Sequence, residues 1–332
     1  MEHAANTDAE RKIIAILKVL SESSEPLGSI TIARELERHG IFLSERAVRY
    51  HLRIADERAY TLPLGRSGRM LTPGGMEELA MALAPEQVGF IMEKLELLAF
   101  QTTFNPEKLT GQIPINTSLI DRERFPEALA NMADAFKKGL CVSHMVTTAQ
   151  EGEKLGSVVV PEGRTGLATV CSAAINGVLL KSGVPVNSKF GGVLEIMDSK
   201  PRRFTAVIEY AGTSIDPSEQ YIRAGMTSIG EAARTGKGKI LANFRELPAA
   251  ARSLVGQRID ALKAAGINGV YLLGNTSEPA CQIPVDLGRV GMVLLGGLNP
   301  VAAAVEAGID VENIGESGVI EYERLTPFEE LL

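Results

Sequence analysis

The chain has little of the chemistry on which enzymes and secreted proteins depend. Among its 332 residues there are three cysteines, four histidines and no tryptophan. Cys141, Cys171 and Cys281 show no CxxC spacing, which argues against a disulfide framework and against a structural zinc site. The GxxxxGK[ST] loop and the GxGxxG fingerprint are both missing, so ATP and NAD are not expected. We therefore expect no cofactor and no metal site.

Long apolar runs are absent as well. No apolar run approaches the ~18 residues that a membrane span needs, and residues 1–10 are polar and acidic, unlike an export signal. We expect a cytoplasmic protein without a membrane partner.

Hydrophobic residues make up 45% of the chain and charged residues 23%, as in globular proteins, and the length favours two or three domains.

A catalytic constellation is also missing. Cys171 could act as a nucleophile with His144 as its base, but no nucleophile elbow surrounds it. A cysteine in an apolar stretch is more often a buried packing residue. We expect no catalytic residues and no enzymatic activity.

Charge is distributed unevenly along the chain. The formal net charge is -7, yet residues 1–75 contain 11 basic and 10 acidic residues, against 23 and 31 in residues 76–332. Within residues 40–70 there are six arginines and three acidic residues. A small basic patch on an acidic protein fits a DNA-reading head on a body with another task, although a mixed, solvated face would have the same composition.

Residues 8–75 have the pattern of a winged helix-turn-helix domain. Apolar residues at helical spacing predict helices over 8–22 and 29–39, with a break at Pro26 and Gly28. Ser44 is a plausible N-cap of a third helix, the candidate recognition helix, and residues 59–72 read as a hairpin wing. The expected DNA-binding residues on this helix and wing are Ser44, Arg46, Arg49, Tyr50, Arg53, Arg66 and Arg69.

Residues 76–111 are expected to form a helical linker. Apolar spacing predicts helices over 76–83 and 86–100, and the second has an amphipathic stripe suited either to core packing or to dimerisation.

The region from 112 to 325 contains an internal duplication. Residues 160–167 are echoed by 285–292, and 183–186 by 308–311, at an offset of about 125 residues. The two copies span 112–198 and 239–323, and each has the same order of strands and helices. We expect an α/β (α+β) two-domain protein, in which the second domain is a pseudo-symmetric, duplicated regulatory domain with strands of mixed direction.

Arginines and hydroxyl groups beside glycine-rich turns indicate a small dicarboxylate ligand. Backbone N–H groups of such turns and arginine forks can hold carboxylates, although each arginine could equally pair with a local acid. The expected effector-binding residues are Arg164, Thr213, Ser214, Arg245, Arg289 and Asn299.

Several stretches of the second domain form a recognisable pattern, namely 166–172, 180–186, 189–193, 203–205, 210–217, 242–246 and 296–300. They resemble the regulatory domain of the NrpR family, nitrogen-regulation repressors of methanogenic archaea. The N-terminal segment resembles the winged-helix domain of that family. The resemblance covers residues 8–325, with one regulatory domain where some members have two in tandem.

The resemblance implies a homodimeric transcriptional repressor. Such a protein binds inverted-repeat operators of nitrogen-assimilation genes and releases them when 2-oxoglutarate rises. Two alternatives stay open, namely a winged-helix regulator that responds to a different small anion and an RNA-binding, ribonuclease-associated module.

Overall fold

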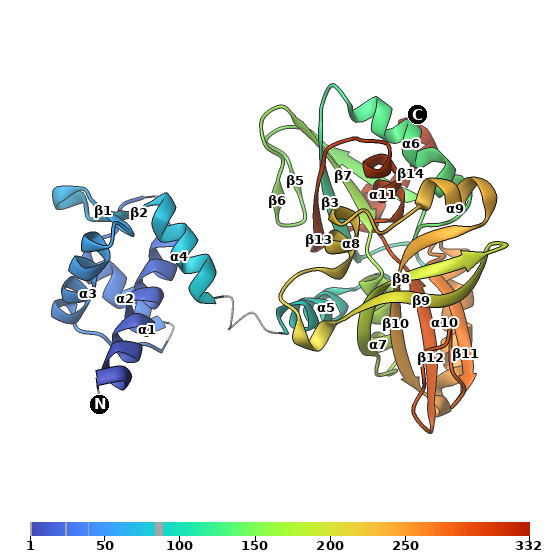
Figure 1. The fold of residues 1–332 in the computed structure, drawn as a ribbon, viewed down its shortest axis with the longest axis horizontal. Coiled ribbons are helices and arrows are strands. Elements are labelled where there is room, and N and C mark those ends of the chain that lie inside the picture. The colour runs from blue at the N-terminus through green and yellow to red at the C-terminus, as the bar shows by residue number, and fades with distance from the viewer. Residues whose placement is uncertain (1, 24, 39, 84–88) are drawn as a thin grey trace. The chain divides into compact units, whose positions relative to one another are not determined.

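The computed structural model describes residues 2–23, 25–38, 40–83 and 89–332, and it divides into two compact units. The first unit covers residues 1–88 and the second covers 89–332. The colour in Figure 1 runs continuously from blue at the N-terminus to red at the C-terminus, and each unit is described by itself below.

The first unit, the head, is a small helical domain with a two-stranded wing. Apolar residues at helical spacing place Leu17, Ile32, Leu36, Val48 and Leu52 in its core, each at most 1% exposed. Ser44 caps the third helix because its side chain accepts a hydrogen bond from the backbone N–H of Ala47. The elements are α1 (Glu2–Ser21), α2 (Ser29–Arg38), α3 (Glu45–Glu57), β1 (Thr61–Pro63), β2 (Arg69–Leu71) and α4 (Pro73–Leu83).

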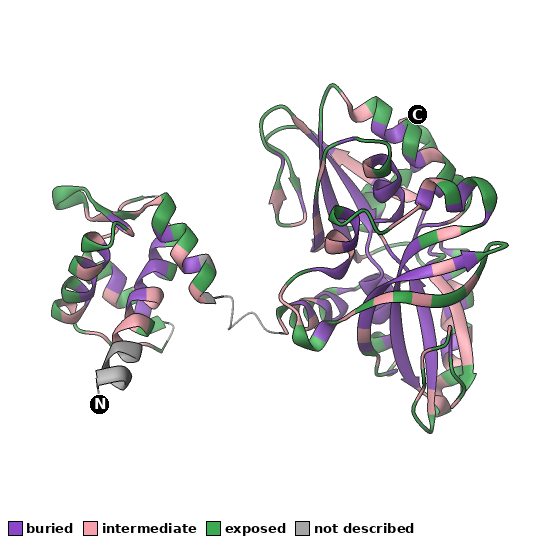
Figure 2. Ribbon diagram, in the orientation of Figure 1, coloured by how far each residue is buried: buried purple, intermediate pink, exposed green. Residues whose placement is uncertain are grey.

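The second unit, the regulatory unit, contains two five-stranded sheets flanked by helices (Figure 1). The sheet orders are β13-β3-β7-β4-β14 and β11-β12-β10-β8-β9. Figure 2 shows that the inner strands are buried along most of their length, whereas β9 is partly exposed throughout. The strands are β3 (Gln112–Asp121), β4 (Met145–Ala149), β5 (Lys154–Leu155), β6 (Val158–Val159), β7 (Arg164–Val170), β8 (Asn187–Met197), β9 (Lys200–Glu209), β10 (Gly238–Pro248), β11 (Val270–Thr276), β12 (Arg289–Leu295), β13 (Val311–Glu321) and β14 (Thr326–Pro327).

Helices cover these sheets, and α5 packs against α7 while α6 packs against α11. Each α-helix of the second unit contributes apolar residues to a buried cluster. The short α8 contributes two, Tyr221 and Ile222. The helices are α5 (Phe90–Gln101), α6 (Phe125–Lys137), α7 (Ala173–Lys181), α8 (Pro217–Arg223), α9 (Ile229–Thr235), α10 (Arg252–Ala264) and α11 (Asn299–Glu306).

The same order of elements occurs twice in the regulatory unit, and each sheet takes one strand from the other half. The order β3-α6-β4-β7-α7-β8 is followed by β10-α10-β11-β12-α11-β13. Strand β8 pairs with β10, and β13 pairs with β3, so the last strand of each half completes the sheet of the other half. The two halves are therefore interlocked through their backbone hydrogen bonds.

The fold class expected from the sequence is confirmed, but the expected mixture of strand directions is wrong. Each pair of neighbouring strands in the part of the chain that the structure describes is antiparallel. Strands β3 and β4, joined by helix α6, run in the same direction, but β7 lies between them and pairs with both. The helical crossover thus joins parallel strands that are not neighbours.

The two helices of the expected linker belong to different units. Helix α4 packs against α1 of the head, and α5 packs against α7 of the regulatory unit. The predicted start of the second helix, at residue 86, and the predicted end of the second head helix, at residue 39, lie outside the described residues. Within the described ranges, no helix is both long enough and apolar enough to cross a membrane.

Candidate functional site

Helix α3 presents a polar, basic face to solvent. Its inward positions are Val48, His51, Leu52 and Ala55, all buried, as the helical period requires. The side chains that the sequence assigns to DNA contact, those of Arg46, Arg49, Tyr50 and Arg53, are all exposed.

The arginines of this face differ in how firmly they are held. Arg49 pairs with Glu45, one turn earlier, and donates to the hydroxyl of Ser29. Arg53 lies 3.7 Å from Glu57 and over the ring of Tyr50. Within the described chain, Arg46 makes no side-chain hydrogen bond or ion pair. Exposed pairs of this kind contribute little to stability, so Arg49 and Arg53 can exchange their partners for phosphate or a base edge, and Arg46 can bind either without giving up a partner.

The two wing arginines have different positions. Arg66 lies exposed in the turn between β1 and β2. Arg69 is partly buried and forks onto Asp56 of α3, with nitrogen–oxygen distances of 2.9–3.1 Å. Arg66 is therefore placed to meet a ligand, whereas Arg69 ties the wing to the recognition helix.

The wing is also held against the loop between α1 and α2 by a close backbone approach. Leu27 and Arg69 exchange two backbone hydrogen bonds of 3.0 Å, and Gly68 beside them has φ = +109°. A Cβ on Gly68 would lie 2.3 Å from the carbonyl oxygen of Leu27. Only glycine fits this position without moving the wing.

Gly68→Ala is expected to destabilise the head by about 1–3 kcal/mol. Alanine rarely adopts the positive φ of this position, and its Cβ would also collide with the backbone of Leu27. Hydrogen–deuterium exchange of the head's amides in the full chain measures this change. Gly40→Ala is the matched control, because Gly40 also has a positive φ but has open space around it. Equal protection of the wing amides in the two variants would contradict the steric explanation.

The cysteine and histidine considered for catalysis are not arranged for it. Burial raises the pKa of the Cys171 thiol to about 12, which leaves it protonated and unreactive. His144 contacts Glu329 and lies beside Phe136 instead. No group of side chains with the composition of a metal site occurs among the described residues.

The structure does not bring the six expected effector residues together. Asn299 is fully buried and bonds both backbone groups of Leu241, which fastens α11 to β10. Thr213 bonds the backbone of Ile215 within its own turn, where Ser214 lies half-buried. Arg289 donates to the carbonyl oxygen of Glu246. Asn299, Thr213 and Arg289 thus bind the protein's own backbone. The two remaining arginines lie apart, because Arg164 lines one pocket and Arg245 bonds Asn176, which lines another.

Arg245 is the largest fully buried side chain of the regulatory unit. Its Nε donates to Asn176 over a long 3.4 Å, its Nη1 donates to a backbone carbonyl, and its Nη2 has no hydrogen-bond partner. The guanidinium also lies over the ring of Tyr210, 5.0 Å from the centroid. A buried cation without a paired carboxylate is costly, so this position is typical of a ligand site.

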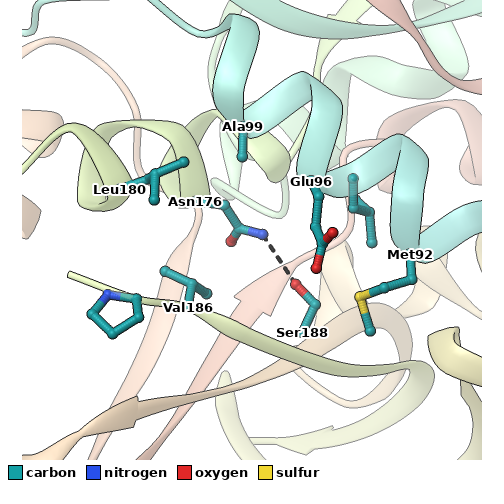
Figure 3. Close-up of a pocket in the computed structure, with 9 residues that line it drawn as sticks. Met92, Glu96, Ala99, Asn176, Leu180, Val186 and Ser188 are labelled. Carbon is teal, nitrogen blue, oxygen red and sulfur yellow. Dashed lines mark hydrogen bonds between the residues drawn. The ribbon is translucent and has the colours of Figure 1, made fainter. Parts of the chain in front are cut away.

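Asn176, which accepts the long hydrogen bond from Arg245, lines a pocket that we call the α5 pocket (Figure 3). It has a volume of about 300 Å³ between α5 and the α7–β8 segment. Asn176 and Ser188 form part of its wall and are hydrogen-bonded to each other. Arg245 lies opposite Ser188 on the neighbouring strand β10. Met92, Leu95 and Glu96 line the pocket from α5, so a ligand here would contact the first helix of the regulatory unit.

A second group of charged residues, buried or half-buried, surrounds Lys94 of α5. Lys94 donates to the carbonyl oxygen of Gly315, whose N–H donates to Glu219. Burial raises the pKa of Glu316 well above its usual value, and the neighbouring charge of Asp216 raises it further. Burial also raises the pKa of Asp216. Because the two carboxyl groups are coupled, they hold one proton between them. We place this proton on Glu316, whose carboxyl group donates a hydrogen bond to the Asp216 carboxylate.

This pair makes stability depend on pH in an unusual direction. Because the pKa of Glu316 is higher in the folded state, the stability it contributes is present at low pH and is lost as the pH rises above its ordinary value. Glu316→Gln is therefore expected to match wild type near pH 5 and to exceed it at pH 8, by up to about 1.4 kcal/mol per pH unit. Urea denaturation at both pH values measures the difference, with Glu321→Gln on the same strand as the control. A difference that shrinks with rising pH would contradict the assignment.

Sequence reasoning missed the partners of Arg245 and the charged group around Lys94. Asn176 and Ser188 are far from Arg245 in sequence. Ser188 lies opposite it because β8 pairs with β10, and Asn176 of α7 reaches it and bonds Ser188. Tyr210, Asp216 and Glu316 are buried polar residues, and their burial is a tertiary property.

The head is a winged helix with an exposed basic helix, α3, and the chain continues into an α/β unit with a buried guanidinium that lacks a carboxylate partner. This combination is typical of transcriptional regulators. The comparisons with known proteins agree. Residues 88–327 match the family of NrpR regulatory domains NRD1 and 2, and residues 14–79 match the ribonuclease R winged-helix domain. The chain belongs to the NrpR family, a family of regulators and not of enzymes.

Curated relatives and a solved structure support this membership. The chain is 38% identical to the global nitrogen regulator NrpRI of Methanosarcina mazei, covering 95% of this chain and 97% of that protein. It is 31% identical to the global nitrogen regulator NrpR of Methanocaldococcus jannaschii, covering 96% of this chain and 55% of that protein. The crystal structure of a nitrogen repressor-like protein from Methanococcus jannaschii is similar, with a TM-score of 0.60, 27% identity and coverage of 72% of this chain and 98% of that chain.

Proposed function

We propose that the protein is a homodimeric repressor that binds inverted-repeat operators of nitrogen-assimilation genes and releases them when 2-oxoglutarate binds its regulatory unit. The observation that carries the DNA-binding part is the exposed face of α3, where Arg46, Arg49, Tyr50 and Arg53 lie together outside the head's core. The names of its relatives support nitrogen control.

The homodimer follows from the geometry of such operators. One chain contributes one recognition helix, which reads one half-site in the major groove. An inverted repeat has two equivalent half-sites, so two copies related by a two-fold axis match it. Sedimentation of the protein with and without operator DNA measures this stoichiometry.

The buried guanidinium of Arg245 supports a carboxylate effector. A carboxylate that displaces Asn176 from its long contact would give Arg245 the charge-assisted, two-point hydrogen bond that it lacks. The mostly apolar α5 pocket would hold the rest of a small dicarboxylate. Since α5 forms one wall of this pocket and is the first helix after the head in sequence, α5 is the element through which an occupant would act on the head.

Fluorescence anisotropy tests the whole proposal. The purified protein is titrated onto its own upstream DNA at fixed salt, because phosphate contacts make the affinity depend on ionic strength. Tight duplex binding that is lost at millimolar 2-oxoglutarate, but not with glutamate or succinate, is the expected result. Tight binding that is indifferent to 2-oxoglutarate would reject this effector and favour a different small anion.

The ribonuclease R type of the head favours one further test. Single-stranded RNA is added as competitor to the same operator complex. If RNA displaces the duplex at equal concentration, the RNA-binding alternative replaces the repressor.

A further inference from the structure

The regulatory unit has a second pocket in the position that matches the α5 pocket in its other half. The α5 pocket is lined by Leu180, Pro185, Val186 and Ser188, and the second pocket is lined by the residues about 125 positions later. Those residues are Val305, Asp310, Val311 and Asn313. Helix α8 forms the opposite wall, as α5 does in the first pocket, and we call the second one the α8 pocket.

The strand pairs behind the two pockets match as well. Ser188 of β8 lies opposite Arg245 of β10, and Asn313 of β13 lies opposite Ser118 of β3. Ser118 donates to Asn313 over 2.7 Å, in a buried contact. The buried arginine of the first site thus has a small, neutral counterpart in the second, and the charge of the α8 pocket comes from other positions.

The α8 pocket has a volume of about 400 Å³ and is lined by side chains of both charges. Its cations are Arg164, at the start of β7, and Arg223, at the end of α8. Its carboxylates are Glu219, Asp310 and Glu312.

Arg164 has hydrogen-bonding capacity that the protein does not use. Its Nη1 is buried and has no partner, and its Nη2 reaches Asp310 only over 3.4 Å. The Asp310 side chain is 88% exposed, so this ion pair is held loosely. A carboxylate that met both nitrogens would form the two parallel hydrogen bonds that a guanidinium prefers.

The carboxylates of the pocket can accept further hydrogen bonds from a ligand. Asp310 and Glu312 are exposed, and Glu219 uses one oxygen to accept the N–H of Gly315. The apolar side chains of Ile222, Val305 and Val311 also line the pocket. A ligand with one carboxylate, one ammonium group and an apolar side chain would match all three kinds of surface.

We propose that the α8 pocket binds a free α-amino acid with an apolar side chain. The Arg164 guanidinium holds its carboxylate, Asp310 and Glu312 receive its ammonium group, and Ile222, Val305 and Val311 contact its side chain. A simple dicarboxylate is disfavoured here, because its second negative charge would meet Glu219, Asp310 and Glu312, with Arg223 as the one other cation that lines the pocket. This site goes beyond the proposed function, since it differs in place and in ligand from the α5 pocket.

Isothermal titration of the full-length protein with L-leucine tests the class of ligand. The matched analogues are 4-methylpentanoate, which lacks the ammonium group, and 3-methylbutylamine, which lacks the carboxylate. We expect saturable binding of L-leucine and at least about tenfold weaker binding of either analogue, because each analogue leaves one charged group unpaired. No binding of L-leucine, L-valine or L-methionine at millimolar concentration would overturn the proposal, as would equal binding of 4-methylpentanoate, which would indicate an anion site only.

Variants test the place of the ligand. Arg164→Gln is expected to weaken L-leucine binding about tenfold or more, and Arg164→Lys is expected to weaken it less, because it keeps the charge but loses the fork. Arg203→Gln is the matched control, since Arg203 is also an ion-paired strand arginine but lies on β9. Unchanged binding in Arg164→Gln would overturn the assignment.

Saturating 2-oxoglutarate separates this proposal from the proposed function. L-leucine binding that persists in 2-oxoglutarate supports two separate sites, and direct competition between the two ligands would overturn the assignment of separate pockets. Because the titration contains no DNA, its result does not depend on whether the protein represses transcription.

Discussion

Replacing Arg46 and Arg49 together with alanine is expected to weaken operator binding by about 2–6 kcal/mol, roughly 1–3 kcal/mol for each guanidinium. Both side chains are exposed near the start of α3, the part of a recognition helix that enters the major groove. Arg49 must give up its contacts with Glu45 and Ser29 to reach DNA. The Arg46→Ala single variant is therefore expected to lose more operator affinity than Arg49→Ala. Fluorescence anisotropy at several salt concentrations separates base contacts from phosphate contacts.

The matched control for this pair is Arg38→Ala. Arg38 is also an exposed helical arginine of the head, paired with Glu35, but it lies at the end of α2. Its removal should change the operator affinity little and leave the head folded. If the double variant and the control bind the operator equally well, α3 is not the recognition helix.

Replacing Arg245 with glutamine is expected to raise the 2-oxoglutarate concentration needed for half-release of the operator by about 10- to 100-fold. This range corresponds to the loss of a hydrogen bond to a charged group, about 1.5–3 kcal/mol. The affinity of the effector-free protein for DNA should stay the same, because Arg245 lies in the regulatory unit and not in the head. Operator release followed by anisotropy across an effector titration measures the shift.

Arg289→Gln is the control for this second prediction. Arg289 was expected from the sequence to share the effector, but its guanidinium donates to the backbone carbonyl of Glu246. Its replacement should leave the release concentration close to wild type. A normal response in Arg245→Gln combined with a lost response in Arg289→Gln would move the effector site away from the α5 pocket.

The head could be predicted from the sequence because its signals are local. The apolar residues of α1, α2 and α3 repeat at helical spacing, Ser44 caps α3 as its position suggests, and the wing follows within a few residues. The same periodicity that buries Val48 and Leu52 exposes Arg46 and Arg53. The role of Arg69 was not predictable, since its partner Asp56 is identified only by the path of the wing.

The effector residues were harder to predict because their partners are distant in sequence. Glycine-rich turns and arginines indicated a carboxylate ligand, but the turn residues Thr213 and Asn299 prove to serve the protein's own backbone. The property that distinguishes Arg245 is complete burial without a carboxylate partner. Burial of this kind depends on the pairing of β8 with β10, which the repeat alone does not reveal.

The exchange of strands between the two halves constrains the order in which the protein can fold during its synthesis. Strand β3 (Gln112–Asp121) is synthesised early, yet one of its neighbours, β13 (Val311–Glu321), leaves the ribosome about 200 residues later. At the 5–20 residues per second of translation, the edge of β3 stays open for roughly 10–40 s. An open edge can pair with a neighbouring nascent chain, so β3 is where chaperone protection or aggregation during synthesis is expected first.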